Sequence, residues 1–128
     1  MTMLEGAVSP QAVRSFFEGK ARKRQSVLDD RFAEAHRDFN RIIEMIIQDY
    51  RPSRIWQWGS LLDRKIFSEI SDIDIAVEGL SSPPVFFEMY GKAEELTSFP
   101  LDLIDIDIIE ASHAASIRSK GRLVYGRA

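Results

Sequence analysis

Two aspartates, Asp72 and Asp74, stand one residue apart within the apolar run of residues 70–77. The isoleucines of this run favour a β-strand, in which alternate side chains point to the same face. The two carboxylates would then lie side by side, an arrangement that proteins seldom keep without a cation to neutralise it. Oxygen ligands suit a hard divalent ion, and Mg²⁺ commonly brings nucleotide phosphates with it. The pattern therefore predicts metal-assisted phosphoryl or nucleotidyl transfer.

A small-residue turn, Gly59-Ser60, precedes this run and follows a first apolar strand at residues 54–58. Glycine allows a close backbone approach, and the serine hydroxyl with neighbouring N–H groups can hold phosphate oxygens. Taken alone such a turn is weak evidence, but the downstream Asp-x-Asp makes the combination more specific. Arg64 and Lys65, in the connector, are candidates for neutralising phosphate charge, and ordinary surface solvation fits each of them equally well.

A third carboxylate comes from the apolar run of residues 101–106, where Asp102 lies early and a solvated charge is not expected. Such a group can bind a second ion or accept a proton from an attacking hydroxyl. Asp105 and Asp107 have the opposite parity, and we expect them at the strand end, facing water. We therefore favour Asp102 as the third member of the site.

The remaining pattern predicts a small mixed sheet flanked by helices, of the α/β or α+β class. Ser9-Pro10 starts a short helix that Gly19 ends, and a long helix follows over residues 22–50. We divide the chain into a helical region at residues 1–50, packing on or extending the domain, and a catalytic domain at residues 51–128. The other expected elements are helices at 85–96 and 109–120, a strand at 101–106 and an edge strand at 123–125.

Composition narrows the function further. The 128 residues are 45% hydrophobic with a net charge of −3, which gives a real core and no overall basic footprint for nucleic acid. A basic run at residues 20–24 is read as a solvated helix, or as a contact to phosphate or a partner. The absence of cysteine excludes disulfides and thiolate sites. With no secretory or membrane-length segment, we expect a cytoplasmic protein that needs no membrane.

Other side chains receive more ordinary interpretations. Trp56 and Trp58 share one face of the first strand, where packing is the default and nucleobase stacking is the alternative. His36 and His113 are isolated in the sequence, so neither is assigned a catalytic role.

At these residues the chain resembles the minimal nucleotidyltransferases, the MNT branch of the polymerase-β-like nucleotidyltransferase superfamily. The resemblance covers roughly residues 50–126 and includes the ending, where Gly121 precedes Tyr125. The matching segments are Arg-Ile-Trp-Gln-Trp-Gly-Ser, Ser-Asp-Ile-Asp-Ile-Ala-Val and Leu-Asp-Leu-Ile-Asp.

The resemblance implies a polymerase-β-like fold with an N-terminal helical extension, and a role for each matched residue. Gly59 and Ser60 would grip the β and γ phosphates of ATP, while Asp72 and Asp74 bind Mg²⁺ and Asp102 completes the site. Leu61 and Leu62 stand where the family usually has small or basic residues. The phosphates would therefore be held more weakly, or with help from Arg64.

Stand-alone members of this family often act as antitoxins to HEPN-domain ribonucleases, and some transfer AMP from ATP to a tyrosine of the toxin. The resemblance thus implies ATP and a HEPN-type toxin as partners, within a homo- or hetero-oligomer. The alternative is an inactive nucleotidyltransferase-fold module that neutralises its partner by binding alone. A small-molecule nucleotidyltransferase subunit, whose partner chain supplies the acceptor pocket, is the third possibility.

Overall fold

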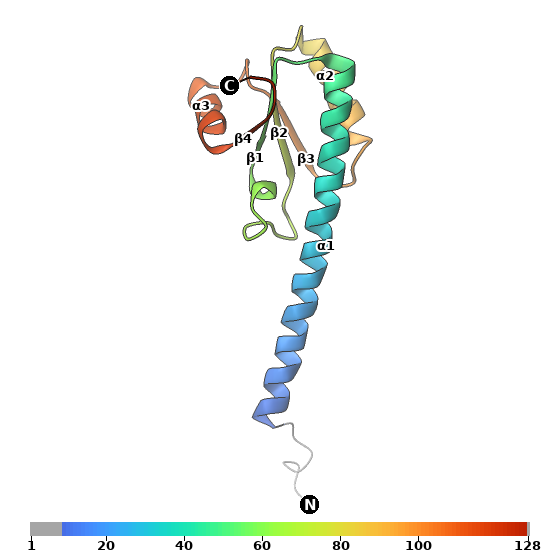
Figure 1. Cartoon of the computed structure of the whole chain (residues 1–128), viewed down its shortest axis with the longest axis vertical. Coiled ribbons are helices and arrows are strands. Elements are labelled where there is room, and N and C mark those ends of the chain that lie inside the picture. The colour runs from blue at the N-terminus through green and yellow to red at the C-terminus, as the bar shows by residue number, and fades with distance from the viewer. Residues whose placement is uncertain (1–8, 128) are drawn as a thin grey trace, which may run out of the picture.

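The computed structural model describes residues 9–127 and contains one long helix, a four-stranded sheet and two shorter helices (Figure 1). In chain order the elements are α1 (Pro10–Tyr50), β1 (Arg54–Trp58), the 3₁₀ turn η2 (Ser60–Leu62), β2 (Ile73–Glu78), α2 (Pro83–Glu94), β3 (Leu101–Asp105), α3 (Ala111–Lys120) and β4 (Arg122–Tyr125). The mixed sheet with flanking helices confirms the predicted fold class. None of the helices in the described range is long and apolar enough to cross a membrane.

Helix α1 is continuous over 41 residues, so the prediction that Gly19 ends a first helix was wrong. A glycine inside a helix costs only about 1 kcal/mol relative to alanine, which the flanking helix-forming residues can offset. The predicted start is confirmed, because the Ser9 side chain accepts a hydrogen bond from the Ala12 N–H at 3.0 Å. The helix ends at the left-handed residue Arg51, with φ of 48°, directly before Pro52.

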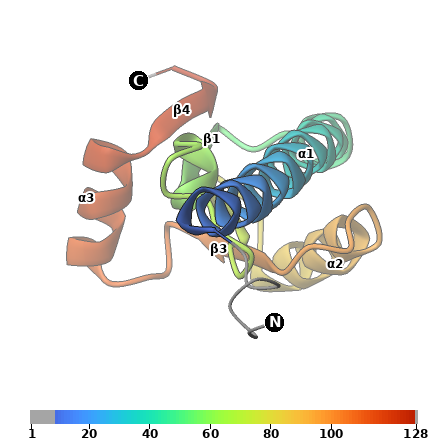
Figure 2. The ribbon, with the colours of Figure 1, turned by 90° about the horizontal axis from the view of Figure 1, so that it is seen from below.

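The strands are ordered β3-β2-β1-β4, with β1 antiparallel to both β2 and β4 and β2 parallel to β3. A parallel pair needs a crossover, and α2 supplies it. Viewed along α1, the sheet lies between α3 on one side and α1 with α2 on the other (Figure 2). This three-layer arrangement buries both faces of β2.

Each face of the sheet has its own apolar core. On the face covered by α1 and α2, Ile73 and Ile75 of β2 pack against a stretch of α1 that includes Phe39, Ile42 and Ile46. On the opposite face, α3 covers a smaller group made of Trp56, Ala76, Ile106, Ala114 and Ile117. Only the second half of α1 takes part in this packing, and its first half extends past the end of the sheet (Figure 1).

Candidate functional site

The candidate site lies at one end of the sheet, where β1 ends and β2 and β3 begin. Asp74 of β2 is the register partner of both Trp58 of β1 and Asp102 of β3. Register partners on neighbouring strands present their side chains to the same face, so Asp74 and Asp102 stand next to each other. Asp72 comes directly before β2, close enough for its charge to act on both. The structure thus brings the three predicted carboxylates together.

Burial and the repulsion between the three carboxylates disfavour ionisation, which raises the pKa values of Asp74 and Asp102. Burial of Asp74, together with the charges of Asp102 and then Asp72, raises the pKa of Asp74 to about 7. Burial and the charge of Asp72 also raise the pKa of Asp102, against a lowering effect of His113. Among the described residues, none donates a hydrogen bond or forms an ion pair to these three carboxylates.

Glu78, four residues beyond Asp74 on the same strand, shows what a compensated carboxylate looks like. Although burial opposes its ionisation, hydrogen bonds from Arg118, Trp56 and Arg54 lower the pKa of Glu78. The donor–acceptor distances are 3.1, 2.9 and 2.8 Å. The chain therefore neutralises one buried acid of β2 with its own cations and leaves the other without any.

Gly59 is fitted to Asp74. Its φ is +81°, a conformation that other residues rarely adopt. A Cβ at this position would lie 2.7 Å from Asp74 Cγ and closer still to its carboxylate oxygen. Ser60 then begins η2, in which the Leu62 and Asp63 N–H groups donate to the carbonyls of Gly59 and Ser60. The turn thus passes directly over the buried carboxylate, as a phosphate-binding loop beside a metal site requires.

Helix α1 holds this turn from the opposite side of the sheet. His36 Nε2 donates to the carbonyl of Leu61 at 3.1 Å, and its ring packs against Phe32. The sequence interpretation gave His36 no catalytic role, and the structure gives it a positioning contact. An unpaired histidine on an otherwise apolar helix face was the available signal.

Arg64 lies in the connector as predicted, but the structure directs it to α1. Its Nε donates to Asp29 Oδ1 at 2.6 Å, and its Nη2 donates to the Gln25 carbonyl at 3.3 Å. The sequence could not show this pairing, because the two groups come from elements 35 residues apart. A phosphate-binding role for Arg64 stays a prediction.

The expectation that Asp105 faces water was wrong. Asp105 is buried, and its carboxylate accepts a hydrogen bond from the Asp107 N–H. Asp107 is exposed as expected, and it accepts one from the Gly79 N–H. The two acids stabilise the turn after β3, at the opposite end of that strand from Asp102.

A cavity of about 190 Å³ adjoins the Gly59 turn on the α3 side of the sheet. The Trp58 ring contacts His113 edge-on, with centroids 5.8 Å apart, and within the described chain its buried Nε1 has no partner. Trp56, by contrast, is buried in the core as expected. The sequence interpretation did not place His113 and Lys120 at the site. The available signal was that their helix, α3, directly precedes β4, the strand that pairs with β1. The lining residues are Trp58, Gly59, His113, Ser116, Ile117, Lys120 and Gly121.

The donor set fits a hard divalent cation. Three carboxylates supply only oxygen ligands, and the excess negative charge around Asp74 would be relieved by Mg²⁺. In residues 9–127 no three acidic, histidine or cysteine side chains already enclose a common point for an ion. Mg²⁺ usually keeps several waters and needs only one or two carboxylates, which this group can supply.

Comparison with known proteins defines the fold class. The chain has an MntA-like fold. A solved structure described as the toxin–antitoxin MntA–HepT matches with a TM-score of 0.56 and 20% identity, over 72% of this chain and 73% of that one. No protein-family model matches the sequence, and no curated protein matches it.

Two further crystal structures give similar matches. One is a mutant of that complex in which two aspartates, two positions apart, are changed to glutamate; its TM-score is 0.57 with 20% identity, covering 70% of this chain and 73% of that one. The other is a toxin–antitoxin with AMP-PNP, at a TM-score of 0.56 and 22% identity, covering 68% and 73%. The spacing of the mutated aspartates equals that of Asp72 and Asp74.

Proposed function

We propose that this chain is an Mg²⁺-dependent nucleotidyltransferase that transfers AMP from ATP to a tyrosine hydroxyl of a HEPN-type toxin and thereby acts as its antitoxin. The observation that carries the proposal is the group of three uncompensated carboxylates beside the Gly59 turn. The shared fold with MntA, and the match to a toxin–antitoxin crystallised with AMP-PNP, support the nucleotide and the class of partner.

Each residue of the site has a task in this reaction. Gly59 and Ser60 hold the β and γ phosphates through backbone N–H groups and the serine hydroxyl. Asp72 and Asp74 would hold Mg²⁺, with Asp102 completing the set. Bound Mg²⁺ supplies charge stabilisation for the attacking and leaving oxygens of an in-line displacement. Lys120 reaches the same cavity and brings a positive charge toward the phosphates.

In the transfer one bond to phosphorus forms, another breaks, and the acceptor hydroxyl loses its proton. The acceptor oxygen bonds to the α-phosphorus, the bond from that phosphorus to the bridging oxygen breaks, and pyrophosphate leaves with the bridging oxygen. The hydroxyl proton passes to a carboxylate, for which Asp102 is suited because burial raises its pKa.

The test is transfer of label from α-labelled ATP, with Mg²⁺, to the protein encoded by the neighbouring gene. We expect labelled partner with the natural chain and none with Asp72→Asn or Asp74→Asn. Asp107→Asn is the matched control, because that exposed acid lies at the far end of β3. A folded natural chain that labels nothing would contradict the proposal.

One observation favours the alternative of an inactive module that binds its partner. The cation predicted to assist the phosphate loop, Arg64, is held by Asp29 and Gln25 on α1. If a chain carrying both Asp72→Asn and Asp74→Asn still neutralised the toxin in cells, the binding module would be the better description.

A further inference from the structure

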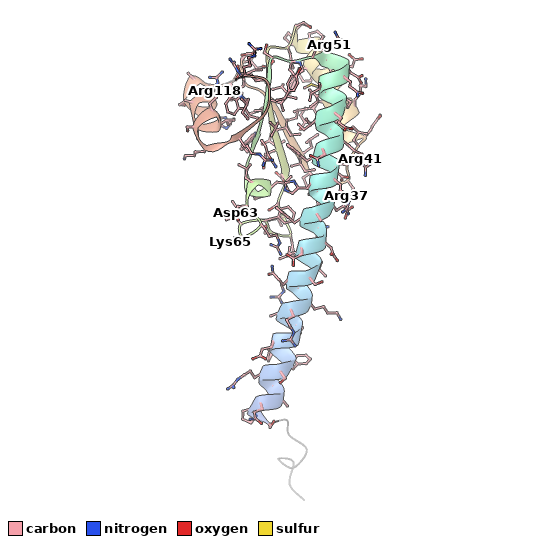
Figure 3. The ribbon with its side chains drawn as sticks, in the orientation of Figure 1. Arg37, Arg41, Arg51, Asp63, Lys65 and Arg118 are labelled. Carbon is pink, nitrogen blue, oxygen red and sulfur yellow. The ribbon has the colours of Figure 1, made fainter. Side chains whose placement is uncertain are left out.

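The first half of α1 is a helix with almost nothing packed on it. We call residues 10–28 the arm. Within it only Gly19 and Leu28 are even half-buried, and all other side chains are exposed. The arm leaves the domain at the end of the sheet where η2 lies, which is also the end that carries the three carboxylates (Figures 1 and 3). In Figure 3 the labelled Asp63 and Lys65 mark this end of the sheet.

One face of the arm is apolar at both ends and basic in the middle. Residues three or four apart share a helix face, so Val13, Phe17, Lys20, Arg24 and Val27 form a continuous stripe. Phe16 contacts Phe17 edge-on at 5.3 Å between centroids, and both rings are 60% exposed. The stripe begins at a hollow of about 370 Å³ lined by Ala12, Val13, Phe16 and Phe17.

The stripe continues onto the loop that leads to Asp72. Leu28 shares a hollow of about 330 Å³ with Ser68, Glu69 and Ile70. Ile70 is 88% exposed and stands only two residues before Asp72. Exposed apolar side chains at both ends of the arm and on this loop mark a candidate interaction site. We call the whole patch the arm surface; it comprises Val13, Phe16, Phe17, Val27, Leu28 and Ile70.

The charge of the arm selects among possible occupants. Glu18 is its single acid, against five basic residues, namely Arg14, Lys20, Arg22, Lys23 and Arg24. Two arms paired through their stripes would bring Lys20 and Arg24 of both copies together, which like-charge repulsion disfavours. Nucleic acid would satisfy the cations but leave the phenylalanines and Ile70 without a partner. Both features are satisfied by a protein surface with an apolar groove and acidic rim.

We propose that the arm surface docks the protein that receives the nucleotidyl group, and that this protein presents an acidic, apolar-grooved surface. The inference rests on the proposed function for the identity of the acceptor. Its geometric basis is that the arm and Ile70 lie at the end of the sheet that holds Asp72 and Asp102. The carboxylates face the α3 side of the sheet, so a partner seated on the arm would bring its acceptor hydroxyl to them around this end of the sheet.

The experiment measures binding of the full chain to the protein encoded by the neighbouring gene by titration calorimetry, and label transfer as a function of that protein's concentration. The arm variants are Phe16→Ser with Phe17→Ser, and Lys20→Glu with Arg24→Glu. The controls are Phe87→Ser, a phenylalanine on α2 that is more exposed than either arm phenylalanine, and Arg37→Glu, an exposed cation farther along α1 (Figure 3).

We expect each arm variant to weaken partner binding about tenfold or more and to raise KM for the partner, with kcat and ATP affinity unchanged. The controls should behave as the natural chain. Loss of partner binding in the arm variants while no chain transfers label would refute only the proposed function. Transfer that is insensitive to the arm variants would refute only the docking surface.

Three other results would also overturn the docking surface. The first is a change of the chain's own molar mass in light scattering caused by the arm variants, because the stripe would then pair two copies. The second is arm-dependent binding of a 20-nucleotide single-stranded RNA with no effect on the partner. The third is a lower melting temperature of the arm variants, because the stripe would then be covered by the chain itself.

Discussion

Asp74 and Asp102 occupy paired positions on two neighbouring parallel strands. Among the described residues, neither carboxylate has a hydrogen-bond donor or an ion-pair partner. The pKa of Asp74 is raised to about 7 by burial and by its acidic neighbours, whereas the pKa of Glu78 on the same strand is lowered by arginine and tryptophan donors. One strand thus carries an acid that the fold neutralises and an acid that it does not.

The first prediction concerns transfer. Asp74→Asn removes a ligand charge and should lower label transfer at least about 100-fold, since several kcal/mol of charge stabilisation are lost. The folded structure should persist, which circular dichroism and a cooperative melt can verify. Asp107→Asn should retain full transfer. Equal transfer by Asp74→Asn and the natural chain would remove Asp74 from the reaction.

The second prediction concerns pH and stability without metal. Because the native pKa of Asp74 lies above its ordinary value of 3.8, the native state holds a proton that the unfolded state has lost between pH 4 and 7. This group therefore makes stability fall as pH rises through that interval, and the loss is complete above about pH 7. Denaturant unfolding at pH 5 and pH 8 should show the fall, and Asp74→Asn should reduce it.

The same linkage predicts the effect of the metal. Ligand carboxylates must be ionised, so Mg²⁺ or Mn²⁺ should bind more tightly at pH 8 than at pH 6 and should restore the stability lost at high pH. Melting temperatures measured at pH 6 and pH 8, with and without Mg²⁺ at about 10 mM, test both effects. A metal effect that persists in a chain with Asp72→Asn and Asp74→Asn would place the ion elsewhere.

The third prediction is that the two acids of β2 respond oppositely to neutralisation. Glu78→Gln should destabilise the protein by roughly 1–3 kcal/mol at pH 7, because a neutral amide replaces the buried, charged acceptor of three hydrogen-bond donors. Its lowered native pKa means that this stabilisation is present above about pH 4.5 and is lost as pH falls. Asp74→Asn at pH 8 without metal should instead stabilise by about 1–3 kcal/mol. Changes of the same sign would contradict the charge assignment.

The fourth prediction concerns Gly59→Ala. The added Cβ would collide with the Asp74 side chain, and the positive φ would be strained. We expect a loss of about 1–3 kcal/mol in stability, and ATP binding weakened beyond what that loss explains. Gly91→Ala is the matched control, because a Cβ there meets no atom within 4 Å; it should be neutral or stabilising. An unaffected Gly59→Ala chain would mean that the turn does not constrain the carboxylate.

The fifth prediction concerns the cavity beside the turn. Lys120→Ala should weaken ATP binding about five- to tenfold and AMP binding much less, because its charge serves the distal phosphates. Trp58 lines the same cavity, so nucleotide titration should change tryptophan fluorescence, and Trp58→Phe should remove that change. A full signal from a Trp58→Phe chain would show that the nucleotide binds away from this cavity.

Much of the fold could be predicted from local sequence signals. The Ser9 cap and the period-two and period-four apolar patterns located the four strands, α2, α3 and both ends of α1 to within a few residues. Gly19 misled, because one glycine weakens a helix without ending it, and nothing local distinguishes a weakened turn from a break. The exposure of the arm was equally invisible, since its apolar residues have the spacing of a packed helix face.

The candidate site divides in the same way. The proximity of the three carboxylates and the close backbone approach at Gly59 could be predicted, because strand parity and turn chemistry depend on residues that are adjacent in the sequence. The partners of Arg64 and the approach of His113 to Trp58 could not, because each contact joins elements that are distant in sequence. Asp105 was misplaced because it is held by a tight turn at the strand end rather than by solvent.

The fit between Gly59 and Asp74 has a consequence for anyone who wishes to redesign this centre. The turn leaves no spare room above the carboxylate. Asp74→Glu, which lengthens the acid by one methylene, and Gly59→Ala, which adds a methyl group, would therefore cause the same steric clash. Adapting the centre to a larger ion would therefore require more room between the turn and the carboxylate, which neither Asp74→Glu nor Gly59→Ala alone provides.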